Sequence, residues 1–410
     1  MTRERFAALM AHAGQIAPEG VEAYVADLTP RGGGLLAPET LERVLAENHV
    51  PDEKGRKLWE ALEEIERDAE LVELSQVLCQ DAVRSFNRGT VCDFEQPRPE
   101  CLKGFAKEAY AFLYVLSCME EGRRRLRARG VPERYDADIP ERMIRKQLAQ
   151  YVEKDDIAFD DYHWDINFYC CAIFLLDRFY FIPMRHYGPE CWRHMESGRV
   201  VALWPADRMI RRDGQLDGVN GVRDPEAIRT VRAETEDSVT AHPVDPAGLV
   251  SLTPVTLDKR EWVKALDRGD HLLALHIPGG EGYTPERVKR SAEMALDFYG
   301  RYFPEIPIKG LWSESWLYDP GLAALLPPDS RIIRVQRQFY CYPTMEGDGM
   351  ARKEVFGHAK MDLNTVTPRT RLQRAMLEAF RSGTRFHTTG MVVLRDEVPL
   401  IGQDPYHVNR

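Results

Sequence analysis

The chain has 410 residues, enough for two domains with sizeable cores, and carries 55 Lys and Arg against 65 Asp and Glu, a formal net charge of −10. This acidic balance argues against a protein that mainly binds nucleic acid, because affinity for phosphate backbones comes from clustered lysine and arginine. With 44% apolar and 29% charged residues, the composition excludes disorder and low complexity.

The chain shows no signal for secretion or for crossing a membrane. No apolar core of signal-peptide type follows Met1, and the longest apolar run, Phe168 to Leu176, falls short of the ~20 residues that span a bilayer. The 8 cysteines form no C-x-x-C pair, as is usual for reduced thiols. We therefore expect a cytoplasmic protein without membrane or nucleic-acid partners, and its oligomeric state stays open.

Hydrophobic periodicity changes along the chain. Up to about residue 155, apolar residues recur at three- and four-residue steps, as in Leu58, Leu62 and Ile65, and predict helices. The run 168–176 is compatible with either a helix or a strand, 179–184 with a strand, and 205–254 with turns and short hairpins. We expect the α+β class, with an all-helical N-terminal domain at 1–155 and a mixed β-sheet domain with flanking helices at 156–410.

A strand, a glycine loop and a helix follow one another in the second domain. Residues 271–276 predict the strand, and Thr284 with Pro285 is typical of a helix N-terminus. A helix over 285–302 would join this strand to a second strand at 308–313 as its parallel neighbour. A third strand at 332–340, a helix that starts at Thr367-Pro368 and a last strand at 391–394 complete the expected domain.

The glycine loop is a candidate anion site. Backbone amides of Gly279, Gly280 and Gly282, together with the Thr284 hydroxyl, stand at a helix N-terminus whose dipole favours an anion such as a pyrophosphate. The alternative is a plain strand-to-helix turn.

Other motifs are weak or missing. No Walker A run, G-x-S-x-G elbow or H-E-x-x-H motif occurs, which removes support for the enzyme classes that use them. Two clusters offer metal ligands, without an established spacing: His186, Cys191 and His194, and Asp160, Asp161, His163 and Asp165. We expect no metal, and a metal-dependent hydrolase remains a lesser alternative.

Several short motifs in consistent order resemble a known family. They are His242-Pro-Val-Asp-Pro246, His276-Ile-Pro278, Ser315-Trp-Leu-Tyr-Asp-Pro320, Leu326-Pro-Pro-Asp-Ser330, Gln336-Arg-Gln-Phe-Tyr340, Leu372-Gln-Arg-Ala375 and Gly390-Met391. Through these motifs, the segment from Ala241 onward resembles bacterial proteins with a helical N-acyltransferase N-terminal domain and a GNAT-like C-terminal domain. The helical first part fits that family by architecture.

The resemblance implies an N-acyltransferase that uses acetyl-CoA or another acyl-CoA and a small-molecule or peptide amine as acceptor. It places the pyrophosphate on Gly279, Gly280, Gly282 and Thr284, and a backbone amide near Ile277 at the thioester oxygen. Glu314 and His276 are then candidate bases, and Tyr318 a candidate acid for the leaving thiolate. The rival hypothesis is a GNAT-like module that binds a ligand or partner without catalysis, since Ile277 and Glu281 depart from the usual phosphate loop.

Overall fold

The computed structural model describes residues 1–17, 25–84, 96–135, 138–360 and 362–407. The chain divides into two compact units, Met1–Leu175 and Leu176–Arg410. This division falls later than residue 155, the boundary expected from the sequence. None of the helices in the described ranges combines the length and the apolar composition needed to cross a bilayer.

The first unit is helical in its described part. Its helices are α1 (Arg3–His12), α3 (Pro38–Glu47), α4 (Asp52–Glu66), α5 (Ala69–Arg84), α6 (Gly104–Ala128), the 3₁₀ turn η1 (Glu133–Tyr135), α7 (Asp138–Lys154) and α8 (Tyr162–Tyr169). The long α6 packs against α4, α5 and α8, and a continuous run of its residues from Ala109 to Met119 is buried. Helices up to Lys154 are confirmed over the described residues.

The ambiguous run 168–176 contains both kinds of structure. Helix α8 ends at Tyr169, and Cys171 has a positive φ of 52°, which breaks the helix before the strand β1 (Phe174–Leu176) begins. Among the residues that are described, β1 is the first strand that belongs to a sheet.

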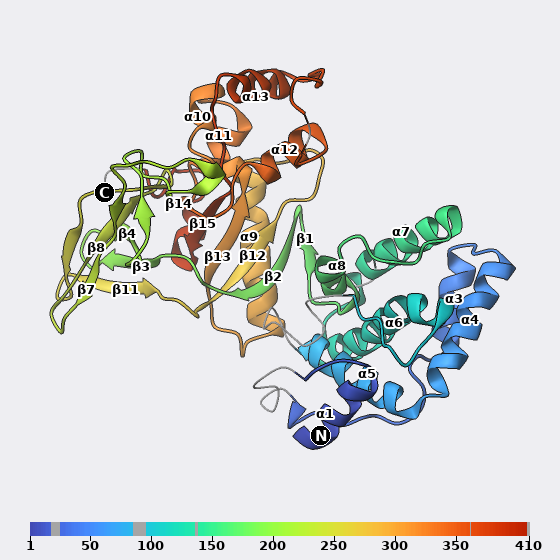
Figure 1. Ribbon diagram of the computed structural model, residues 1–410. Coiled ribbons are helices and arrows are strands. Elements are labelled where there is room, and N and C mark those ends of the chain that lie inside the picture. Colours follow the sequence, from blue (N-terminus) through green and yellow to red (C-terminus); the bar gives the residue numbers. More distant parts are fainter. Residues whose placement is uncertain (18–24, 85–95, 136–137, 361, 408–410) are drawn as a thin grey trace. The chain divides into compact units, whose positions relative to one another are not determined.

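A six-stranded mixed sheet has the order β1-β2-β12-β13-β15-β14, and all its strands except β1, which spans the division at Leu175, lie in the second unit. Besides β1, its strands are β2 (Phe179–Arg185), β12 (His271–His276), β13 (Ile308–Ser315), β14 (Tyr340–Pro343) and β15 (Thr389–Leu394). Strands β12 and β13 are parallel neighbours joined by α9 (Pro285–Tyr302), as expected. Figure 1 shows α9 lying along this sheet.

A second sheet has the order β10-β8-β4-β3-β11, with β7 and β9 also paired to β8, and a small third sheet pairs β5 with β6. The strands of the second sheet are β3 (Glu190–His194), β4 (Val200–Trp204), β7 (Arg232–Glu234), β8 (Ser238–Asp245), β9 (Leu249–Val250), β10 (Val255–Asp258) and β11 (Trp262–Leu266), and those of the third are β5 (Met209–Ile210) and β6 (Ile228–Arg229). The region predicted as turns and short hairpins thus contains the eight-residue strand β8.

The remaining elements lie between the strands in the chain or follow the last of them. They are η2 (Val219–Gly221), η3 (Trp316–Tyr318), α10 (Leu322–Leu325), α11 (Arg331–Gln336), α12 (Gly349–Phe356), α13 (Arg371–Arg381) and η4 (Arg395–Leu400). Helices α12 and α13 belong to a separate apolar cluster around Trp316, Met376 and Phe380.

The prediction of a strand over 332–340 was wrong. Residues Arg331–Gln336 form the helix α11, and the strand β14 starts only at Tyr340. The Ser330 hydroxyl accepts a hydrogen bond from the Ile333 backbone N–H and caps the helix. The β-branched residues of this run favour strands, and for this reason the sequence suggested a strand here. Helix α13 likewise begins after a capping box formed by Thr370 and Gln373, later than Thr367-Pro368.

Candidate active site

The two parallel strands at the centre of the sheet separate toward their C-terminal ends. Their pairing runs from His271 with Ile308 to Ala274 with Trp312. Beyond that point β12 keeps its pairing with β2 up to His276, while β13 keeps its pairing with β15 up to Ser315. The backbone groups that face each other beyond Ala274 and Trp312 are therefore outside the ladder.

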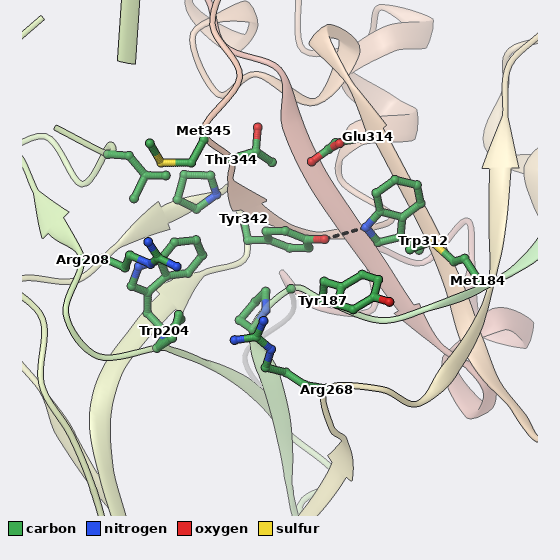
Figure 2. A pocket seen from close by; sticks show the side chains of 15 residues that line it. Met184, Tyr187, Trp204, Arg208, Arg268, Trp312, Glu314, Tyr342, Thr344 and Met345 are labelled. Atoms are coloured by element: carbon green, nitrogen blue, oxygen red, sulfur yellow. Dashed lines mark hydrogen bonds between the residues drawn. The ribbon is translucent and has the colours of Figure 1, made fainter. Parts of the chain in front are cut away.

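A cavity of about 400 Å³ opens on the face of the sheet that carries Trp312 and Glu314. Its walls are largely apolar and aromatic, and include Met184, Trp204, Leu216, Trp312 and Tyr342. Arg208, Arg268 and Glu314 are the charged residues among those that line it. Figure 2 shows the side chains of Met184, Trp204, Arg208, Arg268, Trp312 and Glu314 around the ring of Tyr342. Its size and its few polar groups are typical of a small-molecule site.

The Tyr342 ring is held in place by one hydrogen bond and by two close glycines. The indole N–H of Trp312 donates to the Tyr342 hydroxyl at 2.7 Å. A Cβ on Gly390 would lie 2.4 Å from the Tyr342 ring, and one on Gly188 would lie 2.8 Å from its hydroxyl. Glycine at both positions therefore lets the ring lie against the sheet and form a floor of the cavity.

Glu314 is half-buried on β13 and points into the cavity. Burial raises the pKa of its carboxyl above the ordinary value of 4.5, and the nearby carboxylate of Glu346 raises it further. A carboxylate with a raised pKa is a better proton acceptor near neutral pH than an exposed one.

Ala274 of β12 pairs with Trp312 of β13, and side chains alternate between the two faces along each strand. His276 and Glu314, each two residues further on, therefore lie on the same face of the sheet, but His276 does not line the cavity. Burial lowers the pKa of its imidazole to about 4, so the ring is neutral at pH 7. Ile277 follows it directly, where β12 has already separated from β13. His276 is the weaker base of the two candidates.

The glycine loop between β12 and α9 is organised by one arginine. The Arg178 guanidinium donates to the backbone carbonyls of Glu281 (2.6 Å), Pro278 (2.8 Å), Gly280 (3.2 Å) and Gly279 (3.3 Å). Gly280 and Gly282 have φ values of 101° and 94°, which favour glycine. With its carbonyls directed to Arg178, the loop is held in one conformation at the start of α9.

Thr284 caps that helix, since its side-chain oxygen accepts from the Arg287 N–H at 3.3 Å. The cationic side chains of Arg287 and Arg290 both reach the single carboxylate of Asp177, at 3.0 and 3.4 Å. Two cations on one anion, together with Arg178 and the helix dipole, favour a negatively charged ligand at the loop.

Tyr318 lies on the other side of the sheet from Glu314. It is completely buried in η3 and packs edge-to-face on Phe339, and burial raises the pKa of its hydroxyl. The pKa of Tyr283, a residue of the glycine loop, is raised by burial and by the neighbouring Tyr318. The expected site residues therefore form two groups: Glu314 and His276 on one face, and Tyr318 with the glycine loop on the other.

Asp319 holds Tyr318 in this position. Its buried carboxylate accepts from the backbone N–H of Gly321 at 2.6 Å and from that of His387, whose Nδ1 lies 3.2 Å away. Gln336 donates to the Asp319 carbonyl at 2.8 Å. Asp319 and Gln336 belong to motifs that carried the family resemblance, and their role here is to fix η3.

The two metal clusters considered from the sequence do not assemble. In the described ranges, the one group of three His, Cys, Asp or Glu side chains close enough to share an ion is His12, Asp68 and Cys101, in the helical unit. The His186 ring instead bonds the Pro189 carbonyl at 2.9 Å, and Cys191 is buried.

Several residues of the cavity were not found from the sequence. Trp204, Arg208, Arg268 and Tyr342 come from β4, two loops and β14, which are far apart in the chain. The available signals were the alternation of Trp312 with Glu314 along β13 and the Gly390-Met391 motif, whose glycine accommodates Tyr342.

Comparison with known proteins agrees with this architecture. Residues 39–171 match the model of the N-acyltransferase N-terminal domain, and residues 224–392 match that of the GNAT-like C-terminal domain. None of the curated proteins matches the sequence. The chain therefore belongs to the N-acyltransferase family that combines these two domains.

Solved structures of acyltransferases share the fold at low identity. A mutant acyltransferase in complex with octanoyl-CoA has 17% identity and a TM-score of 0.53, over 95% of this chain and 99% of that chain. An acyltransferase in complex with decanoyl-CoA and teicoplanin has 18% identity and a TM-score of 0.52, over 96% and 99%. A complex with decanoyl-CoA alone has 17% identity and a TM-score of 0.52, over 96% and 100%.

Proposed function

We propose that the protein transfers an acyl group from acyl-CoA to an amine at the point where β12 and β13 separate. The observation that carries this proposal is the opening between the two strands beside a cavity that contains a half-buried carboxylate, Glu314. A thioester between the strands would have the glycine loop on one side of the sheet and the cavity on the other.

The residues of the loop suit the phosphates of coenzyme A. Backbone N–H groups from Gly279 to Thr284 stand at the positive end of α9, and Arg178 orders the loop by binding its carbonyls. The pantetheine arm would extend along β12, whose backbone past Ala274 is open toward β13. The amide near Ile277 would then face the thioester oxygen.

The chemical step follows from the two groups of side chains. Glu314 accepts a proton from the acceptor ammonium, and the freed amine attacks the thioester carbon. The C–N bond forms, an oxyanion develops and is stabilised by backbone N–H groups, and the C–S bond breaks as the carbonyl re-forms. Tyr318, on the loop side of the sheet, supplies the proton that the thiolate takes up. The second proton of the attacking nitrogen passes to solvent as the neutral amide forms, and solvent restores the proton of Tyr318.

The solved acyltransferases that share the fold were crystallised with octanoyl-CoA or decanoyl-CoA. The apolar walls formed by Met184, Trp204 and Trp312 agree with a donor or acceptor of substantial apolar area. We therefore propose acyl-CoA as the co-substrate, with chain length to be decided among acetyl, octanoyl and decanoyl donors.

The test combines binding and turnover. Titration with CoA and with the three acyl-CoAs measures binding, and release of free thiol with a panel of amines measures transfer. We expect binding and amine-dependent thiol release. Binding without transfer to any amine would support the non-catalytic alternative, and absence of CoA binding would overturn the proposal.

A further inference from the structure

Two arginines of the cavity have no anionic partner. Arg208, in the loop after β4, and Arg268, in the loop between β11 and β12, both line the cavity and are exposed. Among the residues that the structure describes, neither guanidinium forms an ion pair. Their acidic neighbours in the chain bind elsewhere: Asp207 pairs with Arg229 at 3.3 Å, and Asp267 pairs with Lys264 at 3.0 Å.

The opposite side of the cavity is acidic. Glu314 lies there, and the carboxylate of Glu346 is close enough to raise its pKa. In Figure 2 the ring of Tyr342 lies between Glu314 and the two arginines. The cavity thus has one positive and one negative side with the Tyr342 ring between them, and Trp204 and Trp312 also line it.

This separation of charge favours a ligand that carries both a positive and a negative group. An ammonium group is favoured beside Glu314 and Glu346, while a carboxylate or phosphate is favoured between two arginines, which bind such groups with charge-assisted hydrogen bonds. The phosphates of coenzyme A have a separate proposed site at the glycine loop, on the other face of the sheet. Arg208 and Arg268 are therefore left for the second substrate.

We infer that the acceptor is an amine that also carries a carboxylate or a phosphate, with its amine at Glu314 and its anionic group between Arg208 and Arg268. This inference rests on the proposed function, because it takes Glu314 as the group that receives the amine proton. It makes Arg208 and Arg268 specificity-determining residues for the acceptor.

The experiment uses two matched pairs of probes that differ only in the anionic group. For the carboxylate, 4-(aminomethyl)benzoic acid is compared with its amide; for the phosphate, glucosamine 6-phosphate is compared with glucosamine. Thiol release from the best acyl-CoA gives kcat/KM, and calorimetry on the protein saturated with CoA gives the affinity without turnover. The pair of probes with the larger preference for its charged member identifies the anionic group as a carboxylate or a phosphate.

We expect the charged member of at least one pair to be preferred by about tenfold or more, the size of effect that one well-placed charged hydrogen bond supplies. In the double variant Arg208→Gln with Arg268→Gln this preference should disappear. The double variant with lysine at both positions should keep much of it, because the charge remains. Arg301→Gln, an exposed arginine near the end of α9, is the matched control.

The outcomes separate this inference from the proposed function. Equal affinity for both members of each pair, or a preference that survives the double glutamine variant, would overturn the inference and leave acyl transfer intact. If no amine releases thiol, the proposed function fails, while the calorimetric preference and its loss in the double variant still decide whether an anion site exists. CoA affinity measured in every variant reports correct folding.

Discussion

The indole N–H of Trp312 on β13 donates to the hydroxyl of Tyr342 on β14 at 2.7 Å, although β15 lies between these two strands. The bond crosses the middle strand because Gly390 of β15, the ladder partner of both Glu314 and Tyr342, has no side chain there. One glycine thus sets the floor of the cavity and the surroundings of the candidate base.

This relationship predicts a strong effect of Gly390→Ala. The new Cβ would lie 2.4 Å from the Tyr342 ring, so the ring must move and its bond to Trp312 breaks. We expect a loss of about 1–3 kcal/mol in the free energy of unfolding, typical of overpacking, together with impaired acyl transfer. Denaturant unfolding and thiol release measure the two effects.

Gly300→Ala is the matched control, since its Cβ meets no atom within 4 Å and the position lies inside α9. Alanine there should stabilise the protein by about 0.5–1 kcal/mol. If Gly390→Ala behaved like Gly300→Ala, the proposed role of the glycine would be wrong.

Glu314→Gln tests the candidate base. The change keeps the shape of the side chain and removes the proton acceptor, so we expect kcat to fall by roughly 10²- to 10⁴-fold with CoA affinity nearly unchanged. In the natural protein, the acid limb of the pH–rate profile should lie above 4.5, the ordinary pKa, because burial raises the pKa of Glu314. A limb at or below that pH would exclude Glu314 as the base.

The same variant has a predicted effect on stability. Because the folded protein raises the pKa of Glu314, the stability that its protonated form contributes is present below the unfolded pKa and is lost as pH rises through the folded pKa. Glu314→Gln should therefore raise Tm relative to the natural protein at pH 7 and lose this advantage near pH 4. Thermal unfolding at both pH values checks the sign.

Variants of Gly280 test the phosphate site. Gly280 has a φ of 101° and open space around it, so Gly280→Ala measures backbone strain alone, while Gly280→Asp adds a carboxylate where the pyrophosphate is proposed to lie. We expect the aspartate variant to weaken CoA binding well beyond the alanine variant, with the difference shrinking at high salt. Equal CoA affinity in the two variants would show that the phosphates bind somewhere other than the glycine loop.

Asp319→Asn tests the support of Tyr318. The Asp319 carboxylate accepts hydrogen bonds from the backbone N–H groups of Gly321 and His387. An asparagine would turn its NH₂ group, which cannot accept, toward one of these two donors. We expect a cost of about 1–3 kcal/mol in unfolding free energy and a lower kcat, because a buried donor loses its acceptor. Asp329→Asn, an exposed residue of the same region, should be neutral. Full stability of Asp319→Asn would contradict this role.

The sequence by itself determined the elements whose signals are local. The apolar stripes predicted the helices of the first unit, and Thr284 with Pro285 marked the start of α9. The parallel pairing of β12 and β13 could then be inferred from the helix that joins them. Local signals failed for Arg331–Gln336, where β-branched residues suggested a strand and the cap at Ser330 made a helix.

Only the tertiary structure decided which residues meet in the cavity. Glu314 and Tyr318 are four positions apart, yet η3 turns the chain after β13 and places them on opposite faces of the sheet. Arg208, Arg268 and Tyr342 meet at the cavity because two sheets and their loops bring together distant segments. A local sequence pattern cannot predict such contacts between distant residues, because they depend on the order of the strands in the sheets and on which loop covers which face.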